Sequence, residues 1–227
     1  NGVPQDSDSE KIWRDFGVER IEKRGREDNF WGPTGDQGPC GPTTEIYING
    51  TEIWNIVFNE YYCESDKTLK PLAHKGVDTG MGLERLAMVA QGKKNIFETD
   101  LFDGVIKRMG GEGSRSQRIV VDHMRAIVFL IGDGVVPGNK DRGYILRRLL
   151  RRVASHFLKG HAVLHQRFTA GNQPPVIATR RSIASHIIDE YGRIEQYGYL
   201  LDRKEMILSV IEEEYNKFDS ALRKGLH

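Results

Sequence analysis

The dipeptide Asn49-Gly50 is the sequence feature that most constrains the fold, because it separates two runs rich in β-branched and aromatic residues, Thr43–Ile48 and Thr51–Tyr62. A two-residue type I′ turn needs positive φ at both central positions, and an Asn-Gly pair adopts such angles readily. Two strand-like runs joined in this way predict a β-hairpin. We therefore expect the first half of the chain to build an antiparallel sheet around this hairpin.

The turn also predicts a register for the hairpin. Counting outward from it, Ile48 faces Thr51 and Thr44 falls opposite Asn55. Successive side chains of a strand point to opposite faces of a sheet. Asn55 and Val57 are therefore expected on one face, and the large apolar side chains of the same run on the other.

Turns and short elements fill the rest of the first half. A loop rich in glycine and proline covers Gly32–Pro42, and a further strand is expected around Leu72–Thr79. Gly80 and Gly82 follow that strand and precede an apolar-periodic helix, so the chain turns sharply there. Residues 9–26 predict a short charged helix followed by a connecting strand.

The second half of the chain has helical periodicity instead, so the fold class is α+β. A Gly/Ser-rich segment at 108–117 is the best internal boundary, and residues 160–180 predict a loop. The expected helices are Asp100–Met109, Arg118–Ile131, Tyr144–Phe157, Ser182–Tyr191 and Arg203–Leu226.

Composition and charge exclude several classes of protein. The 227 residues are 38% hydrophobic and 29% charged, which is typical of one or two globular domains. The longest apolar runs are too short to span a membrane, and the first residues do not resemble a signal peptide. Cys40 and Cys63 form neither a disulfide framework nor a CxxC metal clip. A cytoplasmic protein with reduced thiols is therefore expected.

The net charge of +1 hides a segregation along the chain. Residues 1–100 carry 12 basic and 18 acidic side chains, a net charge of −6. Residues 101–160 carry 12 basic and 5 acidic side chains, a net charge of +7, and residues 161–227 are balanced. Such asymmetry indicates either a polyanionic partner for the basic segment or an ordinary solvated surface.

The basic segment contains the clearest amphipathic helix of the chain, Tyr144–Phe157. Its leucines fall on one side at 100° per residue, and four arginines fall on the other: Arg147, Arg148, Arg151 and Arg152. The preceding loop presents Asn139, Lys140 and Arg142 at the helix start. Arginines suit phosphate contacts and an asparagine suits a base edge, so the pattern favours a nucleic acid over a capped surface helix.

The segment Asp78–Arg85 has the chemistry of a ligand site. Its glycines permit close approach of a ligand, a helix N-terminus attracts anions, and Arg85 offers a planar fork for phosphate. With the carboxylate of Asp78 nearby, an amine-bearing substrate beside a nucleotide would fit. A tight strand-to-helix turn with a surface arginine remains the alternative, since the segment matches neither a Walker A loop nor GxGxxG.

The remaining candidates are weaker. The loop Gly32–Pro42 either places Trp31 and Asp36 over a pocket or uses the tryptophan to plug the core. His161 and His165 are spaced i, i+4 but have no third ligand nearby in the sequence, so a metal site is not expected. No GxSxG elbow indicates a hydrolase, and the run Glu212–Glu214 predicts a solvated helix face.

Taken together, four motifs resemble those of alanyl-tRNA synthetases, in order and with plausible spacing. They are NFWGPTGDQGPCGPTTEIY, EIWNIVF, VDTGMGLERLAMV and RIVVDHMRAIVFLIGDGVVPGNKDRGYILRRLLRRV. The match is dense from Asp28 to Val153, and the tail EEEYNKFDSALRKGL also resembles the family's helical region. Several long motifs in one chain make this resemblance highly specific, although residues 160–190 fit the family poorly.

The resemblance implies a class II aminoacyl-tRNA synthetase, in which an antiparallel-sheet catalytic domain precedes an all-α tRNA-recognition domain. Residues 1–110 would be the distal part of the first, and residues 111–227 an incomplete form of the second. The implied reaction activates alanine with ATP and Mg²⁺ and then transfers it to tRNA(Ala). Orientation and charge neutralisation would supply most of the catalysis.

The resemblance also implies roles for individual residues. Asp78 would pair with the ammonium of alanine, and Asn55 would hydrogen-bond the substrate. Trp31, Val57 and Gly80 would form the walls of the pocket. Gly82 and Arg85 would hold ATP, which makes Asp78 and Arg85 the expected catalytic pair. The tRNA acceptor stem would be bound by Asn139, at the position that helps to read a G·U pair, and by Lys140, Arg142, Arg147, Arg148, Arg151 and Arg152.

The departures from the family pattern are as informative as the matches. Counterparts of motifs 1 and 2 are missing upstream of Asp28, and so is the editing domain with its zinc ligands, so no zinc site is expected in this chain. The chain begins with Asn rather than Met, which predicts a fragment of the synthetase with the N-terminal half as a partner. The alternatives are a non-catalytic RNA-binding protein derived from the family, an inactive fragment that needs the missing half from another chain, and a sensor of alanine or nucleotide.

Overall fold

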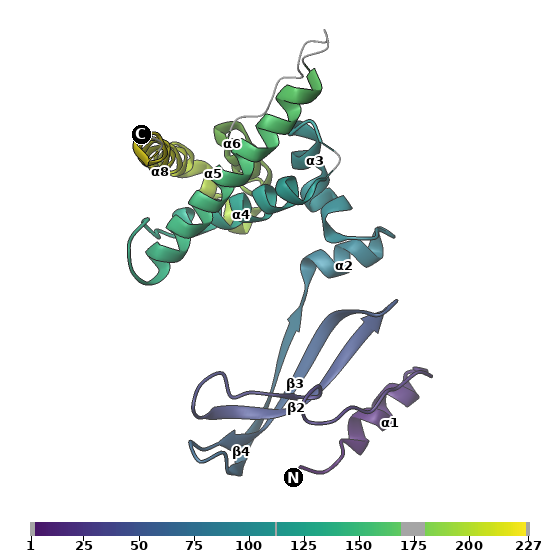
Figure 1. Ribbon diagram of the computed structural model, residues 1–227. Coiled ribbons are helices and arrows are strands. Elements are labelled where there is room, and N and C mark those ends of the chain that lie inside the picture. Colours follow the sequence, from purple (N-terminus) through teal and green to yellow (C-terminus); the bar gives the residue numbers. More distant parts are fainter. Residues whose placement is uncertain (1–2, 112, 169–179, 226–227) are drawn as a thin grey trace. The chain divides into compact units, whose positions relative to one another are not determined.

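A computed structural model describes residues 3–111, 113–168 and 180–225. It divides into two compact units, Asn1–Lys94 and Asn95–His227. The first contains a four-stranded antiparallel sheet and the second is built from helices, so the chain is mixed α+β as expected (Figure 1).

The sheet unit consists of four strands in chain order and two helices. The strands pair antiparallel in the order β1-β2-β3-β4 (Figure 1). Their bounds are Phe30–Trp31 for β1, Gly38–Ile48 for β2, Thr51–Cys63 for β3 and Leu69–Met81 for β4. Helix α1, Ser7–Asp15, precedes the sheet, and α2, Leu83–Ala90, follows β4 directly. The sharp strand-to-helix turn predicted at the glycines is confirmed.

The predicted hairpin is confirmed, because Asn49 and Gly50 have φ values of 51° and 78° and Ile48 pairs with Thr51. The predicted pairing of Thr44 with Asn55 is wrong. A register shift lies between Ile46 and Tyr47, where β3 has one more residue than β2. This bulge places Glu45 opposite Asn55. A shift of one residue exchanges the two faces of a strand. The bulge therefore determines which β2 side chains lie on the same face as Asn55.

Two other expectations for the sheet unit need correction. No described residue between α1 and β1 forms a strand, although one was expected within 9–26. Nearly all residues of this segment are exposed, so water can hydrogen-bond its backbone, and its side chains make local ion pairs, with Arg20 and Arg24 both 2.7 Å from Glu22. The glycine- and proline-rich loop also ends early, since β2 begins at Gly38 rather than after Pro42.

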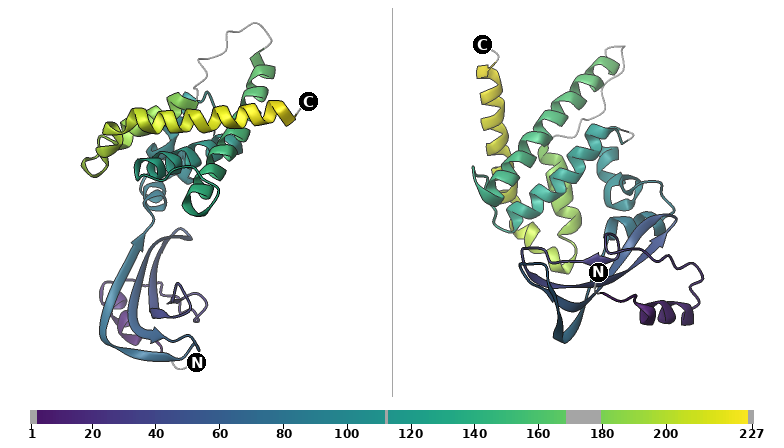
Figure 2. Two further views of the ribbon diagram at one scale, coloured as in Figure 1. Left: turned by 90° about the vertical axis from the view of Figure 1, so that its left-hand side faces the viewer. Right: turned by 60° about the horizontal axis from the view of Figure 1, so that its bottom comes forward.

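The helical unit packs around one apolar core, and Figures 1 and 2 show how its helices are arranged. Its elements are η1 Ile96–Glu98, α3 Asp100–Arg108, α4 Arg115–Gly132, α5 Asp141–Phe168, α6 Arg180–Tyr191, η2 Glu195–Tyr197, α7 Tyr199–Asp202 and α8 Lys204–Gly225. Helix α4 runs alongside α5, and α8 packs against both α5 and α6. The buried Leu146, Leu150 and Val153 confirm the apolar side expected for α5.

Helix α3 belongs to this core as well. Phe102, Val105 and Ile106 are buried in the same cluster as Met124 of α4. The Gly/Ser-rich segment 108–117 therefore lies inside the helical unit, between α3 and α4. There Ser114 and Gln117 form a capping box that starts α4 three residues earlier than the apolar pattern indicated.

Helix α5 was expected to end at Phe157 but continues to Phe168. The loop predicted at 160–180 is therefore wrong for residues 160–168, which are helical. The backbone of His161 and His165 is helical. Residues 169–179, which complete the expected loop, lie outside the described residues.

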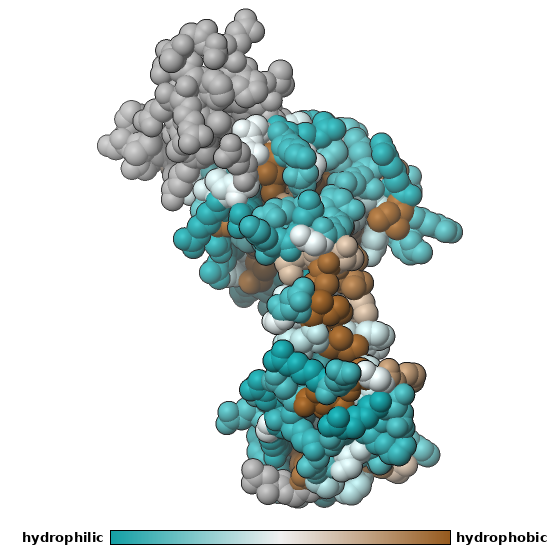
Figure 3. All heavy atoms as spheres, turned by 90° about the vertical axis from the view of Figure 1, so that its right-hand side faces the viewer, coloured by the Kyte–Doolittle hydropathy of each residue, from teal (hydrophilic) through white to brown (hydrophobic). Residues whose placement is uncertain are grey.

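The face drawn in Figure 3 is mostly hydrophilic, with its hydrophobic side chains gathered in a few patches. In the sheet unit the exposed apolar residues include Val77, Met81 and Leu83. Cys40 and Cys63 are buried free thiols, and burial raises the pKa of Cys40 above its ordinary value. None of the described helices combines the length and the apolar character needed to cross a membrane.

Candidate functional site

Six residues from three adjacent strands form a grid on one face of the sheet. Directly opposed residues in antiparallel strands share a face, as do residues two apart along one strand. The grid has two rows, Thr43–Val57–Asp78 and Glu45–Asn55–Gly80. We call these six residues the strand grid. It brings together four of the residues that the sequence assigned to substrate binding, from parts of the chain more than 20 residues apart.

The strand grid contains buried polar atoms that lack partners. Val57, at its centre, is 6% exposed, and Thr43 beside it is also buried. The hydroxyl oxygen of Thr43 and the amide oxygen Oδ1 of Asn55 are buried without a hydrogen-bond partner in the described part of the chain. An unpaired buried polar group costs about 1–3 kcal/mol, so these two atoms are candidates for hydrogen bonds to a polar ligand.

The third strand of the grid supplies a carboxylate next to open space. Asp78 is exposed, and its Oδ1 accepts a hydrogen bond of 2.8 Å from the backbone N–H of Thr79. A Cβ placed on Gly80 would meet no atom within 4 Å. The space next to Asp78 is therefore free for a small cationic group.

Helix α2 brings a guanidinium to the end of the same sheet. The backbone N–H of Gly82 donates to the Ile53 carbonyl at 3.0 Å, which fixes the helix start to β3. Arg85, in the first turn, donates from Nη1 to Oε2 of Glu52 at 3.0 Å and to the Glu52 carbonyl at 3.2 Å. The N-cap residue Gly82 makes no side-chain capping bond, so the α2 N-terminus and Arg85 together suit an anion.

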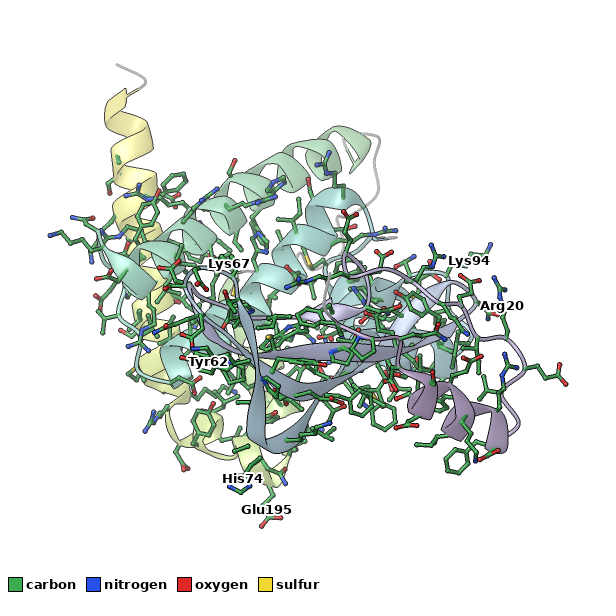
Figure 4. The ribbon with its side chains drawn as sticks, turned by 90° about the horizontal axis from the view of Figure 1, so that it is seen from below. Arg20, Tyr62, Lys67, His74, Lys94 and Glu195 are labelled. Atoms are coloured by element: carbon green, nitrogen blue, oxygen red, sulfur yellow. The ribbon has the colours of Figure 1, made fainter. Side chains whose placement is uncertain are left out.

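The loop residues expected over a pocket lie at the other edge of the sheet. Trp31 pairs with Gly41 across β1 and β2, two residues before Thr43, and is 37% exposed. It does not plug the core. Asp36 is exposed, and its carbonyl accepts a hydrogen bond of 3.2 Å from Nζ of Lys67, labelled in Figure 4.

The helical unit carries a separate basic surface. On α5 the side chains of Arg148, Arg151 and Arg152 are exposed, as the helical pattern indicated. The loop before α5 exposes Asn139, Lys140 and Arg142. These six residues, which we call the basic surface, lie next to one another along the chain and combine five cations with one amide.

Arg147 does not belong with the other arginines. Its side chain is 21% exposed, and Nε donates to Oε2 of Glu214 on α8 at 3.2 Å. Glu214 itself is 9% exposed. The prediction that Glu212–Glu214 forms a solvated face is therefore wrong for Glu214, because α8 packs that residue against α5.

Residues 2–227 match the family model described as class II (A) tRNA synthetases. The chain belongs to that family.

Individual class II (A) relatives agree with this assignment. An alanine–tRNA ligase of Chloroflexus aurantiacus is 39% identical over 99% of this chain and 26% of the relative. Alanine–tRNA ligases of Petrotoga mobilis and Idiomarina loihiensis are 34% and 35% identical, over 97% and 98% of this chain. The chain thus spans about a quarter of the length of the curated relatives it matches.

Three residues of this class II chain that were not predicted from the sequence lie in the strand grid or contact Arg85. Thr43 and Glu45 share the face of Asn55, and only the bulge reveals it. Glu52 holds Arg85, and no spacing rule relates two residues 33 positions apart. The alternation within β2 would have identified Thr43 and Glu45 once the register was known.

No cluster of three or more His, Cys, Asp or Glu side chains suited to a metal ion occurs among the described residues of this synthetase chain. The exposed His74 on β4 points away from the sheet (Figure 4).

Proposed function

We propose that this chain is part of an alanine–tRNA ligase, which activates alanine with ATP and transfers it to tRNA(Ala) in the cytoplasm. The observation that supports the proposal most directly is the strand grid. It joins an exposed carboxylate, two unpaired polar atoms and the open space at Gly80 on the same face as one buried valine.

Alanine fits the strand grid in size and charge. The carboxylate of Asp78 would bind the ammonium group, and Oδ1 of Asn55 would accept a hydrogen bond from it. Val57 and the space above Gly80 would limit the side chain to about a methyl group, with Trp31 closing the edge at β1. A pocket of this kind discriminates by about 1–3 kcal/mol per methylene.

ATP fits the end of the sheet beside α2. The α2 N-terminus at Gly82 and the guanidinium of Arg85 would bind its phosphates, and Mg²⁺ would accompany the nucleotide. An oxygen of the alanine carboxylate forms a bond to the α-phosphorus as the bond to pyrophosphate breaks. Arg85 stabilises the charge that develops on phosphate, and Asp78 keeps the nucleophile oriented.

Strand β4 gives a structural reason for a partner segment. It pairs with β3 along one edge, and no described strand pairs with the other. Nearly all of its residues are exposed. An unpaired edge of 13 residues is a template for another strand, and we propose that it receives the half of the synthetase that carries motifs 1 and 2, which would complete the ATP site.

The helical unit would bind the acceptor stem of tRNA(Ala) through the basic surface. Arginine and lysine side chains neutralise phosphates, whereas the amide of Asn139 has the groups to read a base edge. We retain the functional division proposed from the sequence, with residues 1–110 serving catalysis and residues 111–227 serving tRNA recognition.

The deciding experiment is alanine-dependent exchange of pyrophosphate into ATP, measured with this chain alone and with the N-terminal half of a relative added. Exchange that requires alanine, and that exceeds the exchange given by the added half by itself, supports the ligase. Salt-sensitive tRNA binding without exchange in both mixtures would favour the non-catalytic RNA-binding alternative.

Replacing Gly80 by Val is expected to reduce alanine affinity by about 10- to 100-fold, because the side chain would occupy the space reserved for the substrate. The free energy of unfolding should change by less than about 1 kcal/mol, because no atom of the chain lies within 4 Å of that site. Gly76→Val is the matched control, since Gly76 is equally unobstructed on the same strand but lies outside the grid. Equal effects of both substitutions on alanine binding would contradict the assignment.

Replacing Arg148 by Ala should weaken RNA binding to a similar degree for every hairpin tested. Its exposed guanidinium would neutralise one phosphate, so the slope of log affinity against log salt should decrease by about 0.7–0.9. Titration of labelled hairpins at three salt concentrations measures this slope. An unchanged slope would remove Arg148 from the RNA interface.

A further inference from the structure

We propose that Arg147 and Glu214 form a clamp that holds the side-chain amide of Asn139 with its NH₂ group outward. The proposal rests on the proposed RNA-binding function of the basic surface. It assigns Arg147 a positioning role in place of the phosphate contact that its sequence pattern indicated. It also assigns a role to Glu214, which lies 75 positions from Asn139 on another helix.

The contacts of Arg147 connect three segments. Nη1 donates to Oδ1 of Asn139, and Nη2 donates to the Pro137 carbonyl at 3.3 Å. Nε and Nη2 donate to the two carboxylate oxygens of Glu214 at 3.2 and 3.5 Å. The guanidinium thereby ties the loop before α5 to α8, and its donors are directed at protein acceptors.

Charge and burial explain why Arg147 stays inward. Burial alone would raise the pKa of Glu214, but hydrogen bonds from Lys217 and Arg147 outweigh it, so the pKa lies below its ordinary value. Lys217 contacts the same carboxylate at 3.1 Å. Glu214 is therefore ionised at neutral pH and pairs with the guanidinium, while Lys217 shares the same carboxylate. A guanidinium whose donors are held by protein acceptors in this way contributes little to binding a phosphate.

The loop that carries Asn139 is already closed by its backbone. The N–H of Gly138 donates to the Gly143 carbonyl at 2.9 Å, and the N–H of Tyr144 donates to the Lys140 carbonyl at 3.0 Å. A Cβ on Gly143 would lie 2.6 Å from the Val136 carbonyl oxygen. The backbone at Asn139 is fixed between these contacts, so the remaining freedom of the residue is rotation of its side chain.

The hydrogen bond from Arg147 prevents this rotation and fixes which end of the Asn139 amide faces inward. An arginine can only donate hydrogen bonds, so the amide oxygen of Asn139 must face Arg147. The NH₂ group then points away and donates to no residue that the structure describes. An outward donor selects an acceptor on a base, such as O4 of uracil, over the amino group that cytosine presents at that position.

The test compares Arg147→Met with Arg148→Met in the full chain. Two RNA hairpins with the acceptor-stem sequence are titrated at three salt concentrations, one with a G·U pair and one with G·C. Relaxation of the Asn139 side-chain ¹⁵N, measured without RNA, reports directly on the clamp. Glu214→Gln serves as a second route to the same loss, because it weakens the hold on Arg147 without touching Asn139.

For Arg147→Met we expect the G·U to G·C affinity ratio to fall at least about five-fold. Binding to the G·C hairpin should stay within two-fold, the salt slope should be unchanged, and the order parameter of the Asn139 amide should decrease. Arg148→Met should lower both affinities equally, decrease the slope by about 0.7–0.9 and leave the amide rigid.

Two outcomes would overturn the clamp. One is a decreased salt slope with an unchanged ratio in Arg147→Met, which would make Arg147 a phosphate contact. The other is an Asn139 amide as rigid in that variant as in the parent chain. If the parent chain binds neither hairpin, the proposed RNA-binding function fails, and the relaxation measurement by itself decides whether the clamp exists.

Discussion

Replacing Asp78 by Asn is expected to weaken alanine binding by about 30- to 700-fold, while RNA binding by the helical unit is unchanged. Asn keeps the shape and the hydrogen bond from the Thr79 N–H but removes the charge that pairs with the ammonium group. Bound alanine would cover this charge pair, and losing one partner of a covered pair costs about 2–4 kcal/mol, where every 1.4 kcal/mol is tenfold in affinity. Calorimetric titration with alanine measures the change.

Glu60→Gln is the control for this substitution. It removes a carboxylate from β3 of the same sheet, where Glu60 forms an exposed ion pair with Lys75 at 2.8 Å. We expect little effect on alanine binding because exposed pairs of this kind contribute about 0–1 kcal/mol. If Asp78→Asn reduced alanine and RNA binding equally, a folding defect would explain both and the assigned role of Asp78 would fail.

Replacing Gly41 by Ala is expected to disrupt the sheet unit. A Cβ at this position would lie 1.7 Å from the carbonyl oxygen of Phe58 and 2.8 Å from its carbonyl carbon. Both atoms belong to the backbone of β3, so neither can rotate away as a side chain would. We expect a loss of about 3 kcal/mol or more and a fall of the midpoint temperature by about 10 °C or more, measured by thermal unfolding.

Gly80→Ala is the control for Gly41→Ala, because it also replaces a strand glycine by alanine but creates no steric clash. Its Cβ would meet nothing within 4 Å, so its midpoint temperature should stay close to that of the parent chain. A stable Gly41→Ala variant would mean that β2 and β3 separate more easily at the register shift between Cys40 and Thr43 than the structure indicates.

The sequence was sufficient where a local rule determines the structure. The Asn-Gly pair specifies a turn through backbone angles alone, and the turn is present with the expected ends. The apolar side of α5 follows from helical periodicity, and Leu146, Leu150 and Val153 on that side are buried. The pattern of motifs indicated the synthetase family that the comparisons then showed.

Only the tertiary structure decided how distant segments meet. The bulge in β3 exchanged the face of β2 that accompanies Asn55, because strand pairing is a property of two strands and not of either sequence alone. Likewise, Arg147 lies on the polar side of α5 in any helical projection, yet α8 covers it and Glu214 neutralises it. Local sequence determined the turns, the helix faces and the chemistry available, whereas long-range packing determined which of those groups face a ligand and which face each other.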